Sequence, residues 1–234
     1  TLWHTLSLHD ALPISSRDDN QVVQILTRSL PCAMHYEAVP LLTTYVARAV
    51  EFVNRIDRPL LAGSYAAYID GRYMGDGRLP MTVTGQRLAV GFGVDGQLRC
   101  RRELVDKLAD KSWGKRTESY RYRLVLDNYK DTAVKVRLLD RMPVTRSDEL
   151  KITLTDGLLK LSDDEEYRKL MYPEGILRWD IELPPATAGH KATQLEYAFD
   201  MKFDSDMQIS RPTESGKQQL RQQLEDLQMK LHRN

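Results

Sequence analysis

The chain has 234 residues, of which 41% are hydrophobic and 29% are charged, the balance of an ordinary soluble globular protein. Its 34 basic and 33 acidic side chains leave a net charge of +1, which excludes a dedicated nucleic-acid binder because phosphate neutralisation needs a clear excess of Lys and Arg. No uninterrupted apolar run approaches the roughly 20 residues that cross a bilayer, so we expect no membrane-spanning segment.

The first 15 residues are set apart by the DNA that would encode them. With permitted codons, His4 to Ile14 reverse-translates into a common sequencing-adapter sequence in a single reading frame. A natural segment has no reason to match such DNA over so many consecutive codons. We therefore expect residues 1–15 to be a translated artefact, exclude them from fold reasoning, and expect the natural N-terminus to be missing.

Alternation of apolar and polar residues runs through most of the remaining chain. The segments "RLAVGFGV" (87–94), "SYRYRLVLD" (119–127) and "AVKVRLL" (133–139) each place their large apolar side chains on one face of a strand. A short polar turn, Asn128 to Thr132, separates the last two and predicts a hairpin between them. The dipeptides Asp70-Gly71 and Asp95-Gly96 also predict hairpin turns.

The same pattern continues in "ELKITLT" (149–155), "LRWDIEL" (177–183) and "QLEYAFDMKF" (194–203). Pro184-Pro185 removes ladder donors and should end the second of these strands. Strands with one apolar face pack in antiparallel sandwiches, where one face meets the core and the other meets water. The sequence therefore predicts a mainly β protein made of antiparallel, sandwich-like units with one C-terminal α-helix.

We expect two β units, residues 16–110 and 117–204, or one composite domain formed by both. The polar stretch "DKLADKSWGKRTES" (106–119) would then be a linker or a long loop within one larger fold. A second irregular stretch, "LSDDEEYRKLMYPEG" (161–175), suits a short helix or an exposed loop because of its charges.

Helical periodicity is clear only at the C-terminal end, over residues 213–232. A narrow apolar stripe recurs there at spacings of four, three and four residues, formed by Leu220, Leu224, Leu227 and Leu231. So short a helix is marginal in isolation and needs a partner. The stripe is therefore predicted to bind a helix or domain of the same polypeptide, or a second copy of the chain.

The search for chemistry gives no catalytic residue, no metal ligand set and no cofactor motif. Outside the first 15 residues the histidines are His35, His190 and His232, and none lies in a nucleophile motif. The acidic run from Asp163 to Glu166 is read as a solvated loop in preference to a site for a hard cation. Two cysteines without a C-x-x-C pattern exclude a common zinc site; they either form one disulfide or fill separate apolar gaps.

Three segments resemble the C-terminal β-domain of the mucoidy inhibitor MuiA family, and the resemblance covers most of the chain from about Asp19 to Phe203. They are "RPLLAGSYAAYIDGRYMG" (58–75), "VGFGVD" (90–95) and "RMPVTRSDELKI" (141–152). The chain departs from the family pattern at Thr145, where a serine is common, and at "PPATAG" (184–189), where a Pro-Gly turn is more usual.

The resemblance implies a module of a larger bacterial protein, in which this domain follows an N-terminal β-domain and a long coiled coil. Such proteins are often exported and are linked to exopolysaccharide overproduction, so the resemblance implies an extracytoplasmic, envelope-associated interaction or scaffold domain without enzymatic activity. The alternative is a carbohydrate-binding or carbohydrate-active domain, in which exposed aromatic side chains would stack on sugars. The candidate aromatic residues are Tyr65, Tyr68, Tyr73, Trp113 and Trp179.

Overall fold

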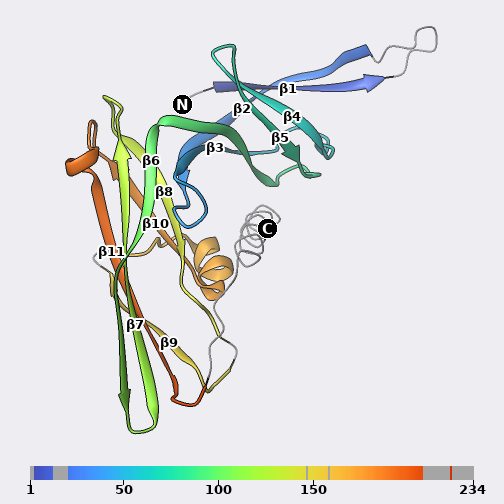
Figure 1. Cartoon of the computed structure of the whole chain (residues 1–234). Coiled ribbons are helices and arrows are strands. Elements are labelled where there is room, and N and C mark those ends of the chain that lie inside the picture. The colour runs from blue at the N-terminus through green and yellow to red at the C-terminus, as the bar shows by residue number, and fades with distance from the viewer. Residues whose placement is uncertain (1–2, 13–20, 146, 158, 208–221, 223–234) are drawn as a thin grey trace. The chain divides into compact units, whose positions relative to one another are not determined.

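The structure, a computed structural model, describes residues 3–12, 21–145, 147–157, 159–207 and 222 (Figure 1). Its described part is mainly β, which confirms the predicted fold class. Two compact units are present and are described separately. Unit 1 contains residues 3–12, 21–34 and 48–93, and unit 2 contains residues 35–47 and 94–207.

Unit 1 contains β1 (Trp3–Leu12), the hairpin of β4 (Gly63–Ile69) and β5 (Arg72–Leu79), and the unit 1 parts of β2 (Gln21–Ala38), β3 (Tyr45–Val53) and β6 (Arg87–Ser112). Asp70-Gly71 forms the turn of the hairpin with positive φ angles of 49° and 75°, so this turn prediction is confirmed. The buried apolar side chains of the unit come mainly from β3 and β6 and from the loops beside them: Leu30, Val50, Phe52, Ile56, Leu60, Leu79, Leu88 and Val90.

Strand β1 lies inside the segment that the sequence analysis excluded as adapter-derived. Its residues pair antiparallel with β2, from Trp3 opposite Pro31 to Leu12 opposite Gln21, with one irregularity after Leu8. Backbone pairing of this kind can form at any open strand edge, whatever the origin of the added segment. Its assignment as a translated artefact stays a prediction.

The β4–β5 hairpin contacts β6 at a point where only glycine leaves enough room. The Tyr65 hydroxyl donates to the Gly91 carbonyl oxygen and accepts from the Gly91 amide, both at 3.0 Å. Gly93 has φ +68°, and a Cβ atom there would lie 2.1 Å from the Met74 carbonyl oxygen. The glycines of "VGFGVD" therefore serve a close backbone approach in unit 1, which agrees with their interpretation as hairpin geometry instead of a phosphate loop.

Unit 2 adds β7 (Lys115–Asn128), β8 (Val134–Arg141), β9 (Lys151–Gly157), β10 (Ile176–Leu183) and β11 (Thr193–Asp204). Neighbouring strands follow the order β10-β8-β2-β3-β6-β7-β11-β9. β2 and β8 pair in parallel through three residues, whereas β10 with β8, β6 with β7, and β11 with both β7 and β9 pair antiparallel.

The sheet of unit 2 curls so that distant strands face each other across one core. β10 and β11 are separated by five strands in the sheet, yet the rings of Trp179 and Tyr197 have centroids 5.6 Å apart. The predicted inward positions of "LRWDIEL" and "QLEYAFDMKF" supply about half of this core, and each large apolar side chain contributes roughly 1.5–3 kcal/mol by its burial. The core includes Leu124, Leu126, Val136, Leu138, Leu177, Trp179, Leu183, Leu195, Tyr197, Phe199, Met201 and Phe203.

Short helical turns cover one side of unit 2, at Tyr167–Met171 and Tyr172–Glu174. They confirm the short helix that was one of two interpretations of residues 161–175. Tyr167 and Met171 are buried there against Leu139 and Ile176. The predicted helix at 213–232 lies outside the described residues, except for residue 222.

The hairpin predicted between residues 119–127 and 133–139 is wrong. β7 is flanked by β6 and β11, and β8 by β10 and β2, so the two strands are not neighbours. The polar turn between them is a connection across the curled sheet. The Asn128 side-chain amide holds this connection by donating to the carbonyl oxygens of Thr132 at 3.0 Å and Pro184 at 2.8 Å.

Three further local predictions are wrong, two of them within β6 and one at the ends of β6 and β7. Asp95-Gly96 is not a turn but lies inside the strand, where the Asp95 carboxylate is buried against Lys130. Val94, predicted to face inward, is exposed. The stretch 106–119 is neither a linker nor a loop, because it forms the ends of β6 and β7. Its charged side chains obscured the strand periodicity, since both faces of these ends are polar.

Candidate interaction surface

The ends of β6 and β7 form a two-stranded ribbon joined by a tight turn. Ser112 pairs with Lys115, and the two residues between them, Trp113 and Gly114, have φ angles of 51° and 75°. Positive φ at both positions is typical of a type I′ turn, which suits the twist of paired strands. Tryptophan rarely adopts this backbone conformation, so the turn holds its side chain at some energetic cost.

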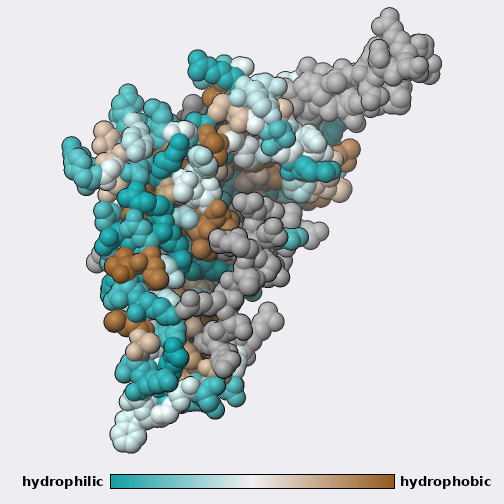
Figure 2. Space-filling model, in the orientation of Figure 1, coloured by the Kyte–Doolittle hydropathy of each residue, from teal (hydrophilic) through white to brown (hydrophobic). Residues whose placement is uncertain are grey.

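Residues 104–113, named here the β6 arm, are exposed throughout. Four of them are large and apolar: Leu104 is 53% exposed, Val105 41%, Leu108 61% and Trp113 101%. In the space-filling view, hydrophobic surface lies among hydrophilic residues over β6, β7 and β11 (Figure 2). The register places Leu104 beside Tyr122 and Leu108 beside Ser119, so exposed apolar side chains lie on both faces of the arm. Several exposed apolar side chains on one element mark an interaction site more often than single ones do.

The β6 arm also has an open strand edge. Besides β7, the neighbour of β6 is β3, which is only nine residues long. The last contact on that side joins the Cys100 amide to the carbonyl oxygen of Thr44, the residue before β3. Within the described part of the chain, the β6 arm therefore pairs only with β7, and its other edge presents unpaired backbone groups.

One face of the ribbon carries a compact charged cluster centred on Glu118. Its carboxylate accepts from the Tyr120 hydroxyl at 2.5 Å and pairs with Arg116 at 2.5 Å and Lys107 at 3.6 Å. The hydrogen bond from Tyr120, together with the two cations, holds the pKa of Glu118 below its usual range although burial opposes this. These contacts hold the side chains on one face of the β6 arm in place, next to its open edge.

The lowered pKa of Glu118 predicts an acid-sensitive contribution to stability. Its ionised form is favoured in the folded chain, so the contribution is complete above the ordinary pKa of 4.5 and is lost as pH falls through the folded value. We expect the stability difference between the parent and Glu118→Gln to be constant from pH 7 to about 5 and to shrink at lower pH. Denaturant unfolding at a series of pH values measures it. Glu165→Gln, an exposed charge change, is the control, and a pH-independent difference for Glu118→Gln would contradict the assignment.

The opposite face of the ribbon and of β11 carries a ladder of ion pairs. Arg123 contacts Glu196 at 2.7 Å and Glu103 at 3.8 Å, and Arg121 contacts Glu196 at 3.8 Å. Exposed pairs of this kind contribute little individually, about 0.2–1 kcal/mol each. Their alternating signs leave this face without a strong net charge.

A buried cluster joins β6, β8 and β11 in the core of unit 2. Arg102 donates from Nε to Asp140 at 2.8 Å and from a terminal nitrogen to the Tyr197 hydroxyl at 3.1 Å, and that hydroxyl donates to Asp140 at 2.8 Å. The guanidinium lies 3.5 Å from the centroid of the Tyr122 ring. Full burial raises the pKa of Asp140, opposed by the positive charge of Arg102. These groups are fully engaged with one another, as in a structural ion pair.

A second ion pair ties the β7–β8 connection to β6. The Lys130 ammonium donates to Asp95 at 2.8 Å and to the Tyr36 hydroxyl at 3.2 Å. Burial opposes the charge on Lys130, but the hydrogen bonds to Asp95 and Tyr36 raise the pKa of Lys130. The positive charge of Lys130 is therefore balanced by the Asp95 carboxylate within the fold.

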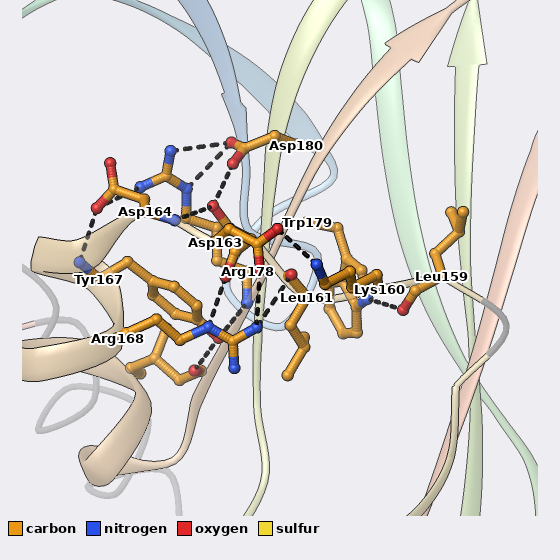
Figure 3. A network of polar contacts seen from close by, with 12 residues as sticks. Leu159, Lys160, Leu161, Asp163, Asp164, Tyr167, Arg168, Arg178, Trp179 and Asp180 are labelled. Carbon is orange, nitrogen blue, oxygen red and sulfur yellow. Dashed lines mark hydrogen bonds and ion pairs between the residues drawn. The ribbon is translucent and has the colours of Figure 1, made fainter.

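A third cluster fixes the 159–171 segment on β10, as Figure 3 shows. The Ser162 hydroxyl donates to Asp180 at 2.5 Å, and Arg178 donates to the other oxygen of that carboxylate at 3.0 Å. Arg168 donates to the backbone carbonyl oxygens of Ser162 at 2.7 Å and Leu161 at 3.1 Å. The Asp180 carboxylate is shared between the Ser162 hydroxyl and the Arg178 guanidinium, so these contacts hold the 159–171 segment on β10.

An open hollow of about 310 Å³ lies beside this cluster on the outer face of β8 and β10. Its charged walls are Lys135, Arg137, Asp180 and Glu182, and His35 completes the polar lining. The register places Arg137 opposite Asp180 and Lys135 opposite Glu182. Cross-strand charge pairing explains this set of residues without a ligand.

The remaining sequence-predicted residues are dispersed. His190 is exposed in a 3-10 turn, whereas His232 and the leucine stripe of Leu220, Leu224, Leu227 and Leu231 lie outside the described residues. In the acidic run, Asp163 pairs with Lys160 at 2.7 Å, and within the described residues no group of three His, Cys, Asp or Glu side chains could hold a metal ion.

The two cysteines form no disulfide in the described structure. Cys32 is half-buried in β2, and Cys100 is buried in β6 with its thiol 3.3 Å from the Thr43 carbonyl oxygen. Burial raises the pKa of the Cys100 thiol to about 12. Cys100 thus fills a small apolar gap, one of the two alternatives that the sequence left open.

The aromatic residues considered as sugar platforms divide into two groups. Trp179 is in the core of unit 2, and Tyr65 is held by its contacts with Gly91. Tyr68 and Tyr73 are exposed on the β4–β5 hairpin, with ring centroids 5.7 Å apart in an edge-to-face arrangement. Trp113, the fifth candidate, is exposed at the turn of the β6 arm. The sequence analysis named this residue but missed the rest of the arm as a site, although Trp113-Gly114 between charged runs was a readable turn signal.

Comparison with known proteins gives one match. Residues 4–203 match a family model described as a domain of unknown function (DUF4139). The match begins within the segment that the sequence analysis attributed to adapter DNA. No curated protein and no solved structure matches the chain. No helix in the described residues is long and apolar enough to span a membrane.

Proposed function

This chain belongs to the DUF4139 family, and from that premise we propose that it is a non-enzymatic interaction module that binds a partner protein through the β6 arm. The observation that carries the proposal is the exposure of Leu104, Leu108 and Trp113 on one ribbon. Aromatic side chains at the centre of interfaces supply much of the binding energy when a partner buries them. The strained turn that presents Trp113 supports a binding role, because strain that persists in a fold often serves function.

The non-enzymatic part of the proposal is supported by how the buried polar groups are used. Asp140 and Asp95 are buried, and each accepts hydrogen bonds from a cation and from a tyrosine hydroxyl that belong to other parts of the chain. Buried charges retained in this way specify which elements pack together. The chemistry inside unit 2 is therefore consistent with a rigid platform for the β6 arm.

The cellular setting belongs to the same proposal. The resemblance of residues 58–75, 90–95 and 141–152 to the mucoidy inhibitor MuiA family supports an extracytoplasmic, envelope-associated role linked to exopolysaccharide control. We further propose that the leucine stripe of residues 213–232 packs on the same polypeptide or on a second copy. Light scattering of the full chain and of a chain ending at Met207 tests this, because a second-copy contact would be lost on truncation.

Site-specific photo-crosslinking in cells that naturally produce the chain tests the β6 arm as an interaction surface. A photoreactive residue at position 108 or 113 should give discrete adducts with a partner, whereas the same residue at the exposed Tyr129 should not. Equal adducts at all three positions, or none at any, would overturn the proposal.

The variant Trp113→Asn separates binding from folding. Asparagine tolerates positive φ and is preferred in type I′ turns, so we expect the thermal stability of the variant to equal or exceed that of the parent by up to about 1 kcal/mol. Loss of the aromatic anchor should nevertheless weaken the adducts formed at position 108 at least tenfold. Adducts that persist undiminished in this variant would exclude Trp113 as an anchor.

Carbohydrate binding is a second candidate, favoured by one observation in unit 1. The exposed pair Tyr68 and Tyr73 lies beside Asp76, whose carboxylate accepts from the Tyr73 hydroxyl at 2.6 Å. Aromatic faces and carboxylates together can bind sugars by stacking and hydrogen bonding. A glycan array with the parent and with a Tyr68→Ala/Tyr73→Ala variant tests this, and binding that is equal for both would reject the site.

A further inference from the structure

The turn at Trp113 fixes which backbone groups of β6 point to its open edge. In a two-residue hairpin, the residues flanking the turn exchange hydrogen bonds, so Ser112 is bonded to β7. Bonding then alternates along the strand, and Asp110 and Leu108 also point their N–H and C=O groups to β7. The backbone groups of Lys107, Ala109 and Lys111 point the other way, to the open edge.

The open edge has defined limits. A bulge between Leu104 and Asp106 interrupts the register at one end, and the turn ends the strand at Trp113. Between them, residues 106–111 form a regular, fully exposed strand. Six residues of strand with three outward-facing backbone positions are enough to bond one short added strand.

The side chains along this edge carry a regular charge pattern. Lys107 and Lys111 lie on one face of the ribbon, with Ala109 between them, because successive side chains of a strand alternate between faces. Asp106 and Asp110 lie on the other face, on either side of the exposed Leu108. The charged side chains of residues 106–111 are therefore lysines on one face and aspartates on the other, and Lys107 also pairs with Glu118 of β7.

We infer that residues 106–111 of β6 accept an extended segment of a partner protein as an additional antiparallel strand. The segment would carry acidic side chains opposite Lys107 and Lys111, basic side chains opposite Asp106 and Asp110, and apolar ones opposite Leu108 and Ala109. This inference rests on the proposed function and names the partner's chemistry. Backbone bonds supply affinity in such strand addition, and the charge pattern supplies specificity.

A second copy of the chain fits this edge poorly. Two antiparallel strands bond only where outward-facing residues oppose each other, so a symmetric pair must be centred on one residue. Centring on Ala109 places Lys107 opposite Lys111, and centring on Leu108 places Asp106 opposite Asp110. Like charges directly opposite each other are destabilising, so the pattern disfavours self-pairing while it admits a complementary strand.

A pair of synthetic peptides tests the inference on the full chain. The peptide Thr-Glu-Lys-Val-Val-Glu-Lys-Thr places each charge opposite its complement in the antiparallel register. Its charge-swapped control, Thr-Lys-Glu-Val-Val-Lys-Glu-Thr, has the same composition. Amide hydrogen exchange measured by NMR should slow at Lys107, Ala109 and Lys111 with the first peptide. It should change little at Leu108, Asp110 and Ser112, whose amides already bond to β7. Equal protection by both peptides, or none, would overturn the inference.

Substitutions at Ala109 provide the matched test in the chain itself. Ala109→Pro removes an outward N–H without removing a bond to β7, so the fold should persist while peptide binding falls at least tenfold. Ala109→Val keeps the N–H and should bind the peptide like the parent. Equal thermal stability of the two variants shows that the ribbon remains folded, and equal peptide binding by them would contradict strand addition.

The outcomes also separate this inference from the proposed function. In one outcome, photo-crosslinking from position 113 still gives adducts in Ala109→Pro while the peptide slows exchange at no amide. That pair of results would mean that the β6 arm binds a partner by its side chains alone. A dimer of the parent that dissociates in Ala109→Pro would identify a second copy as the occupant and would overturn the inference in its stated form.

Discussion

Replacing Asp140 by asparagine should destabilise unit 2 by about 3–5 kcal/mol, the typical cost of leaving one partner of a buried ion pair uncompensated. The Asp140 side chain is fully buried and that of Arg102 is 17% exposed, so little solvent reaches the pair. Asparagine retains an acceptor for Arg102 and Tyr197, but it cannot balance the guanidinium charge. Denaturant unfolding followed by Trp179 fluorescence measures the loss.

Two controls define the origin of this effect. A double variant, Arg102→Met with Asp140→Leu, removes both charges and should be closer in stability to the parent than Asp140→Asn, because no buried charge remains unpaired. Asp163→Asn, which removes one partner of an exposed pair with Lys160, should leave the unfolding midpoint unchanged. An Asp140→Asn variant as stable as the parent would contradict the pairing in the core.

Replacing Gly93 by alanine should destabilise unit 1 by about 2–5 kcal/mol. Positive φ costs an L-residue roughly 1–2 kcal/mol, and overpacking a close contact costs roughly 1–3 kcal/mol more. The new Cβ would lie 2.1 Å from the Met74 carbonyl oxygen, so the backbone of β5 has to move. Chemical denaturation followed by circular dichroism measures this loss.

Gly71 is the matched control, because it has a similar φ of +75° but no atom within 4 Å of its Cβ position. Gly71→Ala should therefore show only the conformational cost, roughly 1–2 kcal/mol. The difference between the two variants isolates the close approach of β5 to β6. If both variants lose the same stability, that contact contributes nothing.

Local sequence pattern predicted the buried side chains of most strands that have one buried face. The alternation in residues 177–183 and 194–203 predicted inward side chains that the core of unit 2 contains, and Asp70-Gly71 and Pro184-Pro185 marked a real turn and a real strand end. These features follow from two properties that a short window reports. One is the two-residue period of a strand, and the other is the backbone preference of Gly and Pro.

The β6 arm was misread because its strand character does not depend on a buried face. Residues 106–119 are polar on both faces, and their extended form is stabilised by pairing with each other across the Trp113-Gly114 turn. An alternation of apolar and polar residues signals a buried apolar face, and the apolar side chains of this ribbon, Leu108, Ala109 and Trp113, are all exposed. A candidate interaction site was therefore hidden in a stretch that resembled a linker.

The sequence by itself determined the β class, most strand positions and which side chains face the core of unit 2, because these depend on neighbours a few residues apart. Only the tertiary structure decided that β7 pairs with β6 and β11 instead of β8, and that Arg102, Asp140 and Tyr197 meet. Strand order is set by contacts between residues far apart in the chain, and a curled sheet brings together charges that no local spacing relates. The open edge of β6 also follows only from the tertiary structure, because it depends on the short length of the neighbouring strand β3.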